Sequence, residues 1–91
     1  MDRIVTRYDL VSAIHNILTT NAVANPEDAV QVVGVAGSWS PGLFAVIPSE
    51  RAKAALEEVL MDITGRRHPT AGNAWILDEA QSLALIKAAE D

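Results

Sequence analysis

The sequence of 91 residues is 49% hydrophobic and 21% charged, a balance typical of one globular domain and unlike that of a disordered chain. Its net charge is −5 and no Lys or Arg occurs between Tyr8 and Glu50, so it lacks the basic stripe of nucleic-acid-binding proteins. The absence of cysteine excludes disulfides and thiolate metal sites, and no apolar run approaches the roughly 18 residues that span a bilayer. We therefore expect one cytoplasmic domain over residues 1–91, without a membrane segment and without direct contact to nucleic acid.

The first predicted helix begins after Thr6. Asp9 takes the place of the usual glutamate in a variant capping box, in which each of the two side chains accepts from the other residue's backbone N–H. Apolar residues recur at helical spacing from Leu10 to Leu18, which predicts a single buried stripe. Residues 3–5 before this helix are expected to form a short edge strand.

A second helix start is followed at once by a strand-like segment. Asn25 and Pro26 are typical of a first helical turn, because asparagine caps it and proline fits its first position. The residues from Val30 to Ala36 are β-branched and glycine-spaced, which favours a strand. We predict at most one helical turn before this strand. A continuous helix from Pro26 to Ala36 is the alternative.

The strongest local signal is a strand that leads directly into a helix over residues 43–65. The apolar run 43–47 follows the turn-like segment 37–42 and so predicts the second strand of an antiparallel hairpin. Ser49 is placed to cap the helix with its hydroxyl, and Gly65 is placed to end it in the left-handed conformation. One side of this helix is apolar throughout. That stripe consists of Ala52, Ala55, Leu56, Val59, Leu60 and Ile63.

The C-terminal part predicts a short strand over residues 74–77 and a last helix. Asp78 is expected to cap this helix, with Gln81 at the capping-box position. The element order is thus (β)αββαβα, which predicts an α+β fold with about three helices and a small, mostly antiparallel sheet. The expected buried side of the last helix consists of Leu83, Ile86, Ala80 and Ala84.

No group of residues in the sequence indicates catalysis. His15 and His68 are the only histidines and lie in no metal-ligand spacing, so we predict no metal. Ser40 misses the nucleophile-elbow pattern because Ser38 occupies its first glycine position, and a turn serine is the better interpretation. The glycines nearby match neither the dinucleotide-binding pattern nor a P-loop. We expect no enzyme and no cofactor.

Two surfaces are candidates for binding a protein partner. The first is the hairpin tip, where Trp39 stands between Ser38 and Ser40 in a turn. Tryptophan is enriched at binding hot spots, although packing of Trp39 against its own sheet or a helix is the alternative. The second is an acidic cluster on the central helix, which is either a solvated face or a docking surface for a basic partner. Its members are Glu57, Glu58 and Asp62.

One flank of the first helix combines hydrogen-bonding side chains. A solvated boundary is the ordinary interpretation of such a flank, and a contact face or a small pocket is the alternative. A ligand-binding or enzymatic role would require an enclosed pocket with Tyr8 or His15 pointing into it. The flank consists of Tyr8, Ser12, His15 and Thr19.

These features favour a small acidic protein–protein interaction module that acts by contact and without catalysis, as a regulator, inhibitor or adaptor. One alternative is an acidic decoy, as some phages encode, that occupies the nucleic-acid-binding groove of a partner protein. Such a decoy would carry its acids in a phosphate-like track on one face. Another alternative is a small ligand-binding or enzyme domain. Short strands and an apolar fraction near one half also predict a homodimer, formed through the sheet edge or the hairpin.

Overall fold

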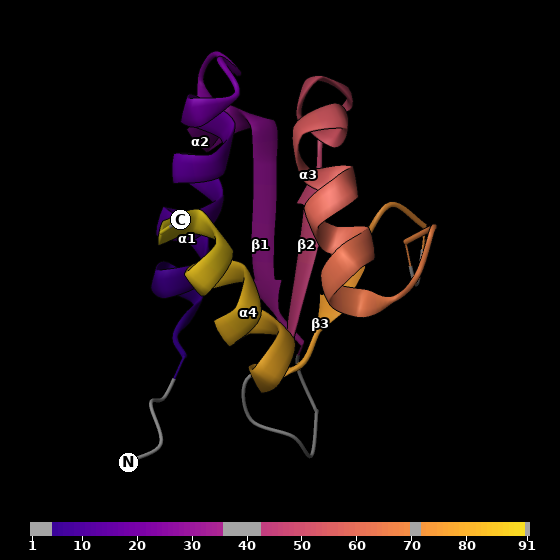
Figure 1. Ribbon diagram of the computed structural model, residues 1–91. Coiled ribbons are helices and arrows are strands. Elements are labelled where there is room, and N and C mark those ends of the chain that lie inside the picture. The colour runs from indigo at the N-terminus through magenta and orange to yellow at the C-terminus, as the bar shows by residue number, and fades with distance from the viewer. Residues whose placement is uncertain (1–4, 36–42, 70–71, 91) are drawn as a thin grey trace.

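The computed structural model describes residues 5–35, 43–69 and 72–90. Its three strands form one antiparallel sheet in the order β1-β2-β3 (Figure 1). Within these ranges, two helices precede β1 and β2, a third lies between β2 and β3 in the chain, and a fourth follows β3. The predicted α+β fold is confirmed. Of the expected first strand, residues 3–4 lie outside the described part, and Val5 belongs to no strand. The elements are α1 (Arg7–Thr20), α2 (Pro26–Ala29), β1 (Val30–Gly34), β2 (Phe44–Pro48), α3 (Glu50–Thr64), β3 (Trp75–Leu77) and α4 (Glu79–Glu90).

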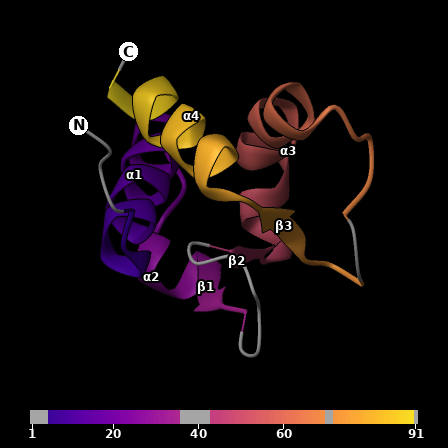
Figure 2. The same cartoon turned by 90° about the horizontal axis from the view of Figure 1, so that it is seen from below.

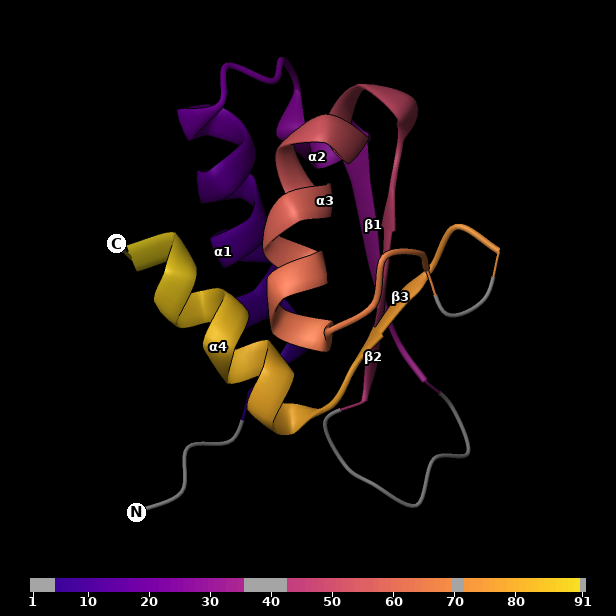
Figure 3. The same cartoon turned by 45° about the vertical axis from the view of Figure 1, so that its right-hand side comes forward.

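The molecule has two layers, a sheet and a layer of helices. Figure 2 shows α1, α4 and α3 together on one side of the sheet, and Figure 3 shows the same separation from another direction. The three helices also pack against one another, with α1 in contact with both α4 and α3. Within the described ranges, no helix covers the opposite face of the sheet.

The core lies between these two layers. Because side chains alternate along a strand, every second residue of the sheet points toward the helices. Val32 pairs with Val46, which pairs with Trp75, and all three are buried. The helices complete the core with fully buried leucine and isoleucine side chains. These are Leu10, Ile14 and Leu18 from α1, Leu56 and Leu60 from α3, and Leu85 from α4.

Helix α1 begins as the sequence predicts. The Thr6 hydroxyl accepts from the Asp9 backbone N–H at 3.2 Å, and the Asp9 carboxylate accepts from the Thr6 N–H at 3.1 Å. The predicted capping box is therefore confirmed. The Arg7 side chain adds a tertiary link, because its Nε donates to the carbonyl of Val32 on the outer strand β1.

The segment after α1 also follows the prediction. One helical turn, α2, leads into β1, so the alternative of a continuous helix from Pro26 to Ala36 is wrong. Asn25 has a left-handed backbone with φ of 51° and makes no side-chain capping bond, contrary to its expected role. The Arg51 guanidinium instead holds this turn, donating to the carbonyls of Ala24 and Asn25, each at 3.2 Å.

Helix α3 has the predicted stripe and stop but not the predicted cap. Gly65 ends it with φ of 71°, and its N–H donates to the Met61 carbonyl at 2.8 Å. Ser49 is the N-cap residue, yet its hydroxyl makes no capping bond and is buried without a partner in the described part of the chain. The predicted side-chain cap is wrong because this hydroxyl is turned into the protein. Within the stripe, Ala52, Leu56 and Leu60 are buried, whereas Ala55, Val59 and Ile63 are half-buried.

Helix α4 is capped as predicted but rotated from the expected orientation. The Asp78 carboxylate accepts from the Gln81 N–H at 2.8 Å, and the Gln81 side chain accepts from the Asp78 N–H at 3.0 Å. The predicted buried side is partly wrong, because alanines lie on several sides of this helix and do not fix its orientation. Ser82, Leu85 and Ile86 are buried, Leu83 is half-buried, and Ala80 and Ala84 are exposed.

Candidate protein-binding groove

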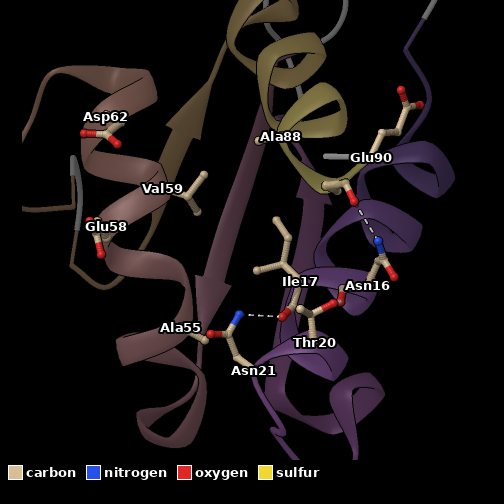
Figure 4. A pocket seen from close by; sticks show the side chains of 11 residues that line it. Asn16, Ile17, Thr20, Asn21, Ala55, Glu58, Val59, Asp62, Ala88 and Glu90 are labelled. Atoms are coloured by element: carbon tan, nitrogen blue, oxygen red, sulfur yellow. Dashed lines mark hydrogen bonds between the residues drawn. The ribbon is translucent and has the colours of Figure 1, made fainter.

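A groove of about 550 Å³ lies where α1, α3 and α4 meet on the helical side of the molecule (Figure 4). Its centre is apolar: Ile17 of α1 and Val59 of α3 lie between the two helices, and α4 contributes alanines. Polar side chains surround this centre. The described lining consists of Asn16, Ile17, Thr20, Asn21, Ala55, Glu58, Val59, Asp62, Ala88, Ala89 and Glu90.

Hydrogen bonds fix the α1 side of the groove. The Asn16 Nδ2 donates to the Ala89 carbonyl at 2.7 Å, which holds the last turn of α4 against α1. The Thr20 hydroxyl donates to the Asn16 carbonyl at 2.9 Å, and the Asn21 Nδ2 donates to the Ile17 carbonyl at 2.8 Å. Thr20 and Asn21 thus donate to the backbone of α1, and Asn16 donates to the backbone of α4.

The carboxylates of the groove have no such partner. Glu58 and Asp62 stand one turn apart on α3, and Glu90 stands on α4 across the groove (Figure 4). Within the described ranges, none of the three forms a hydrogen bond or ion pair, and the described lining includes no Lys, Arg or His. Like charges four residues apart on a helix repel one another, so a cation between them is favourable. The groove therefore combines an apolar floor with a negative rim.

The structure separates the three acidic residues that the sequence grouped together. Glu58 and Asp62 border the groove, whereas Glu57 lines a smaller pocket of about 190 Å³ on another side of α3. Successive helical residues project about 100° apart, which accounts for the separation. The smaller pocket also contains Lys53 and Arg67, so Glu57 has positive neighbours there.

The other predicted binding residues lie elsewhere or are not described. Trp39, Ser38 and Ser40 fall outside the described residues. On the polar flank of α1, Tyr8 is 77% exposed and His15 is half-buried. Neither of them is among the described residues that line the groove or the smaller pocket, whereas Ser12 of the same flank lines an open hollow of about 270 Å³ between α1 and α4.

Several groove residues were not anticipated from the sequence. Asn16, Thr20 and Asn21 lie at the end of α1, and Glu90 lies at the end of α4. Their neighbourhood depends on how α4 docks on α1, and no local pattern indicates that docking. The spacing of Asn16 and Thr20, one helical turn apart, was the one available sign of a shared polar side.

No group of three or more His, Cys, Asp or Glu side chains in residues 5–35, 43–69 and 72–90 is placed to hold a metal ion. No helix among those residues combines the length and the apolar character needed to cross a membrane.

Comparisons of the chain with models of known protein families, with curated protein sequences and with solved structures found no match.

Proposed function

We propose that this chain is a protein–protein interaction module whose groove between α1, α3 and α4 receives a basic segment of a partner protein. The observation that carries this proposal is the composition of the groove. Glu58, Asp62 and Glu90 surround an apolar floor, and they have no cationic partner among the described residues. A cationic side chain from another protein would supply the missing partner.

The geometry favours a partner segment that carries both apolar and basic side chains. A Lys or Arg can lay its aliphatic stem over Ile17 and Val59 while its charged end reaches Glu58 or Asp62. An apolar residue beside it would cover the rest of the floor. The volume of about 550 Å³ accommodates a few side chains of a partner, not a whole domain. The net charge of −5 would also steer a basic partner toward this chain and raise its association rate.

The proposed role is that of a regulator, inhibitor or adaptor that acts by contact and without catalysis. A cytoplasmic location is part of the proposal and rests on the sequence, which contains no cysteine. Self-association is also part of the proposal, because short strands and an apolar fraction of 49% leave surface that a second copy could cover.

The test compares proteins captured from a cell lysate by the wild-type chain and by two charge-reversed variants. In the first variant, Glu58→Lys and Asp62→Lys reverse the rim of the groove. The control is Glu57→Lys, which reverses one carboxylate on the same helix but outside the groove. Quantitative mass spectrometry measures each captured protein, and circular dichroism verifies that every variant is folded.

We expect a partner that both the wild type and the Glu57→Lys control retain and that the Glu58→Lys, Asp62→Lys variant loses. Capture of the same proteins in equal amounts by all three chains would refute the groove as the interface. A partner that binds nucleic acid and is displaced from the chain by nucleic acid would instead identify the acidic-decoy role.

A further inference from the structure

The α1 side of the groove offers an oxygen acceptor that no described donor occupies. The side-chain amide of Asn21 donates through Nδ2 to the Ile17 carbonyl at 2.8 Å. Because a carbonyl oxygen accepts only from a donor, this bond identifies the nitrogen of the amide and leaves Oδ1 free to accept. Figure 4 shows Oδ1 of Asn21 turned toward α3, and none of the described residues donates to it.

The end of α1 adds partial negative charge beside this acceptor. Asn21 is the C-cap residue of α1, and the last turn of α1 contains no basic residue. The C-terminal end of a helix carries roughly half a negative charge, which favours a cation near the last turn. The Thr20 hydroxyl donates to the Asn16 carbonyl at 2.9 Å, so its oxygen also meets the groove as an acceptor. This wall therefore attracts a positive group that donates hydrogen bonds.

The opposite wall makes the same demand. Ionised carboxylates only accept hydrogen bonds, and those of Glu58 and Asp62 on α3 have no donor among the described residues. Between the walls lie Ile17 and Val59, which are half-buried and apolar. An occupant that satisfies the whole groove must donate to both walls and rest on the apolar floor between them.

We propose that the groove binds an arginine of the partner segment in preference to a lysine, and that Asn21 determines this preference. In the proposed contact, the guanidinium donates to Glu58 or Asp62 on α3 and to the Asn21 Oδ1 on α1. This inference rests on the proposed function, because it concerns the same groove and specifies the side chain that enters it.

Geometry and hydration separate arginine from lysine at this site. The guanidinium is planar, and its five N–H donors point in several directions, so one group can donate to acceptors on two facing walls. The three donors of an ammonium surround a single nitrogen, so a lysine reaches one wall at a time. The guanidinium is also more weakly hydrated than an ammonium, so its flat faces rest more favourably on Ile17 and Val59.

The exposure of the two walls sets the size of the preference. Asn21, Glu58 and Asp62 are exposed, so water competes for each of these acceptors in the free protein. Arginine gains one net hydrogen bond over lysine, the bond to the Asn21 Oδ1. We therefore expect the dissociation constant of an arginine peptide to be about fivefold lower than that of the lysine peptide.

NMR titration with three leucine-containing peptides of equal length tests this inference. Their basic residues are arginine, lysine or asymmetrically dimethylated arginine. Dimethylation keeps the charge but removes N–H donors, so this peptide should bind no more tightly than the lysine peptide. Asn21→Ala should weaken the arginine peptide to the level of the lysine peptide and leave the lysine peptide unchanged. Asn73→Ala, the same change at an exposed residue of the smaller pocket, is the matched control and should retain the preference.

Equal dissociation constants of the arginine and lysine peptides for wild type would overturn the proposal, as would a preference that Asn21→Ala leaves unchanged. If Asn21→Ala fails to fold by circular dichroism, the dimethylated peptide decides, and its binding as tightly as the arginine peptide would overturn the proposal. In each of these cases, binding of the peptides in the groove would leave the proposed function intact. Binding of none of the peptides there would overturn both. Failure of the preference and failure of the groove are therefore measured separately.

Discussion

Replacing Leu56 by alanine should destabilise the domain strongly. Leu56 is fully buried in the middle of α3 and belongs to the core that joins the helices to the sheet. The change deletes three carbon atoms, worth about 0.8 kcal/mol for each buried methylene, and leaves a cavity that adds to the loss. We expect the free energy of unfolding to fall by about 3 kcal/mol. Domains of this size have about 5–15 kcal/mol in total.

Leu83→Ala is the matched control for this prediction. It makes the same chemical change in another helix, α4, at a side chain that is only half-buried. Less apolar surface is lost there, so the expected cost is about 1 kcal/mol. Urea titration followed by circular dichroism measures both losses, and the midpoint of thermal unfolding should fall by about 4–8 °C for each kcal/mol. An unchanged midpoint for Leu56→Ala, or equal losses in the two variants, would refute the assignment of this stripe to the core.

Three further substitutions test individual polar groups. Ser82 is fully buried, and its hydroxyl has no partner among the described residues. Ser82→Ala should therefore stabilise the domain by about 1 kcal/mol. A clear loss of stability in urea titration would reveal a hydrogen bond to that hydroxyl. Thr6→Ala removes a formed capping box and should cost about 1 kcal/mol. Ser49→Ala removes a hydroxyl that caps nothing and is buried without a partner among the described residues, so it should not destabilise the domain. A loss as large as that of Thr6→Ala would show that Ser49 does cap α3 in solution.

Local sequence patterns were sufficient to predict most element boundaries. The boxes at Thr6 and Asp78 and the stop at Gly65 each depend on residues a few positions apart, so their geometry is encoded in the sequence around them. The change from one helical turn to a strand at Val30 was also predictable, because β-branched residues replace helix-forming residues there.

Features that depend on packing between distant segments could not be predicted in the same way. The orientation of α4 follows from its contacts with α1 and α3, and its own apolar residues do not determine it. The Ser49 hydroxyl turns inward although its position in the sequence is that of a cap. The groove combines Asn16, Glu58 and Glu90, which belong to three helices far apart in the chain. Of the three carboxylates of its rim, Glu58 and Asp62 of α3 were therefore predicted, and Glu90 of α4 was not.

The central claim is that the groove between α1, α3 and α4 binds a basic, partly apolar segment. It is tested most directly by NMR titration of the ¹⁵N-labelled chain with a short synthetic peptide of leucine and lysine residues. We predict that the amide shifts cluster around Ile17, Val59 and Ala88, and that they disappear in the Glu58→Lys, Asp62→Lys variant and remain in Glu57→Lys. Shifts that map to the strands β1, β2 and β3 and not to the groove, or that persist unchanged in the Glu58→Lys, Asp62→Lys variant, would contradict the claim.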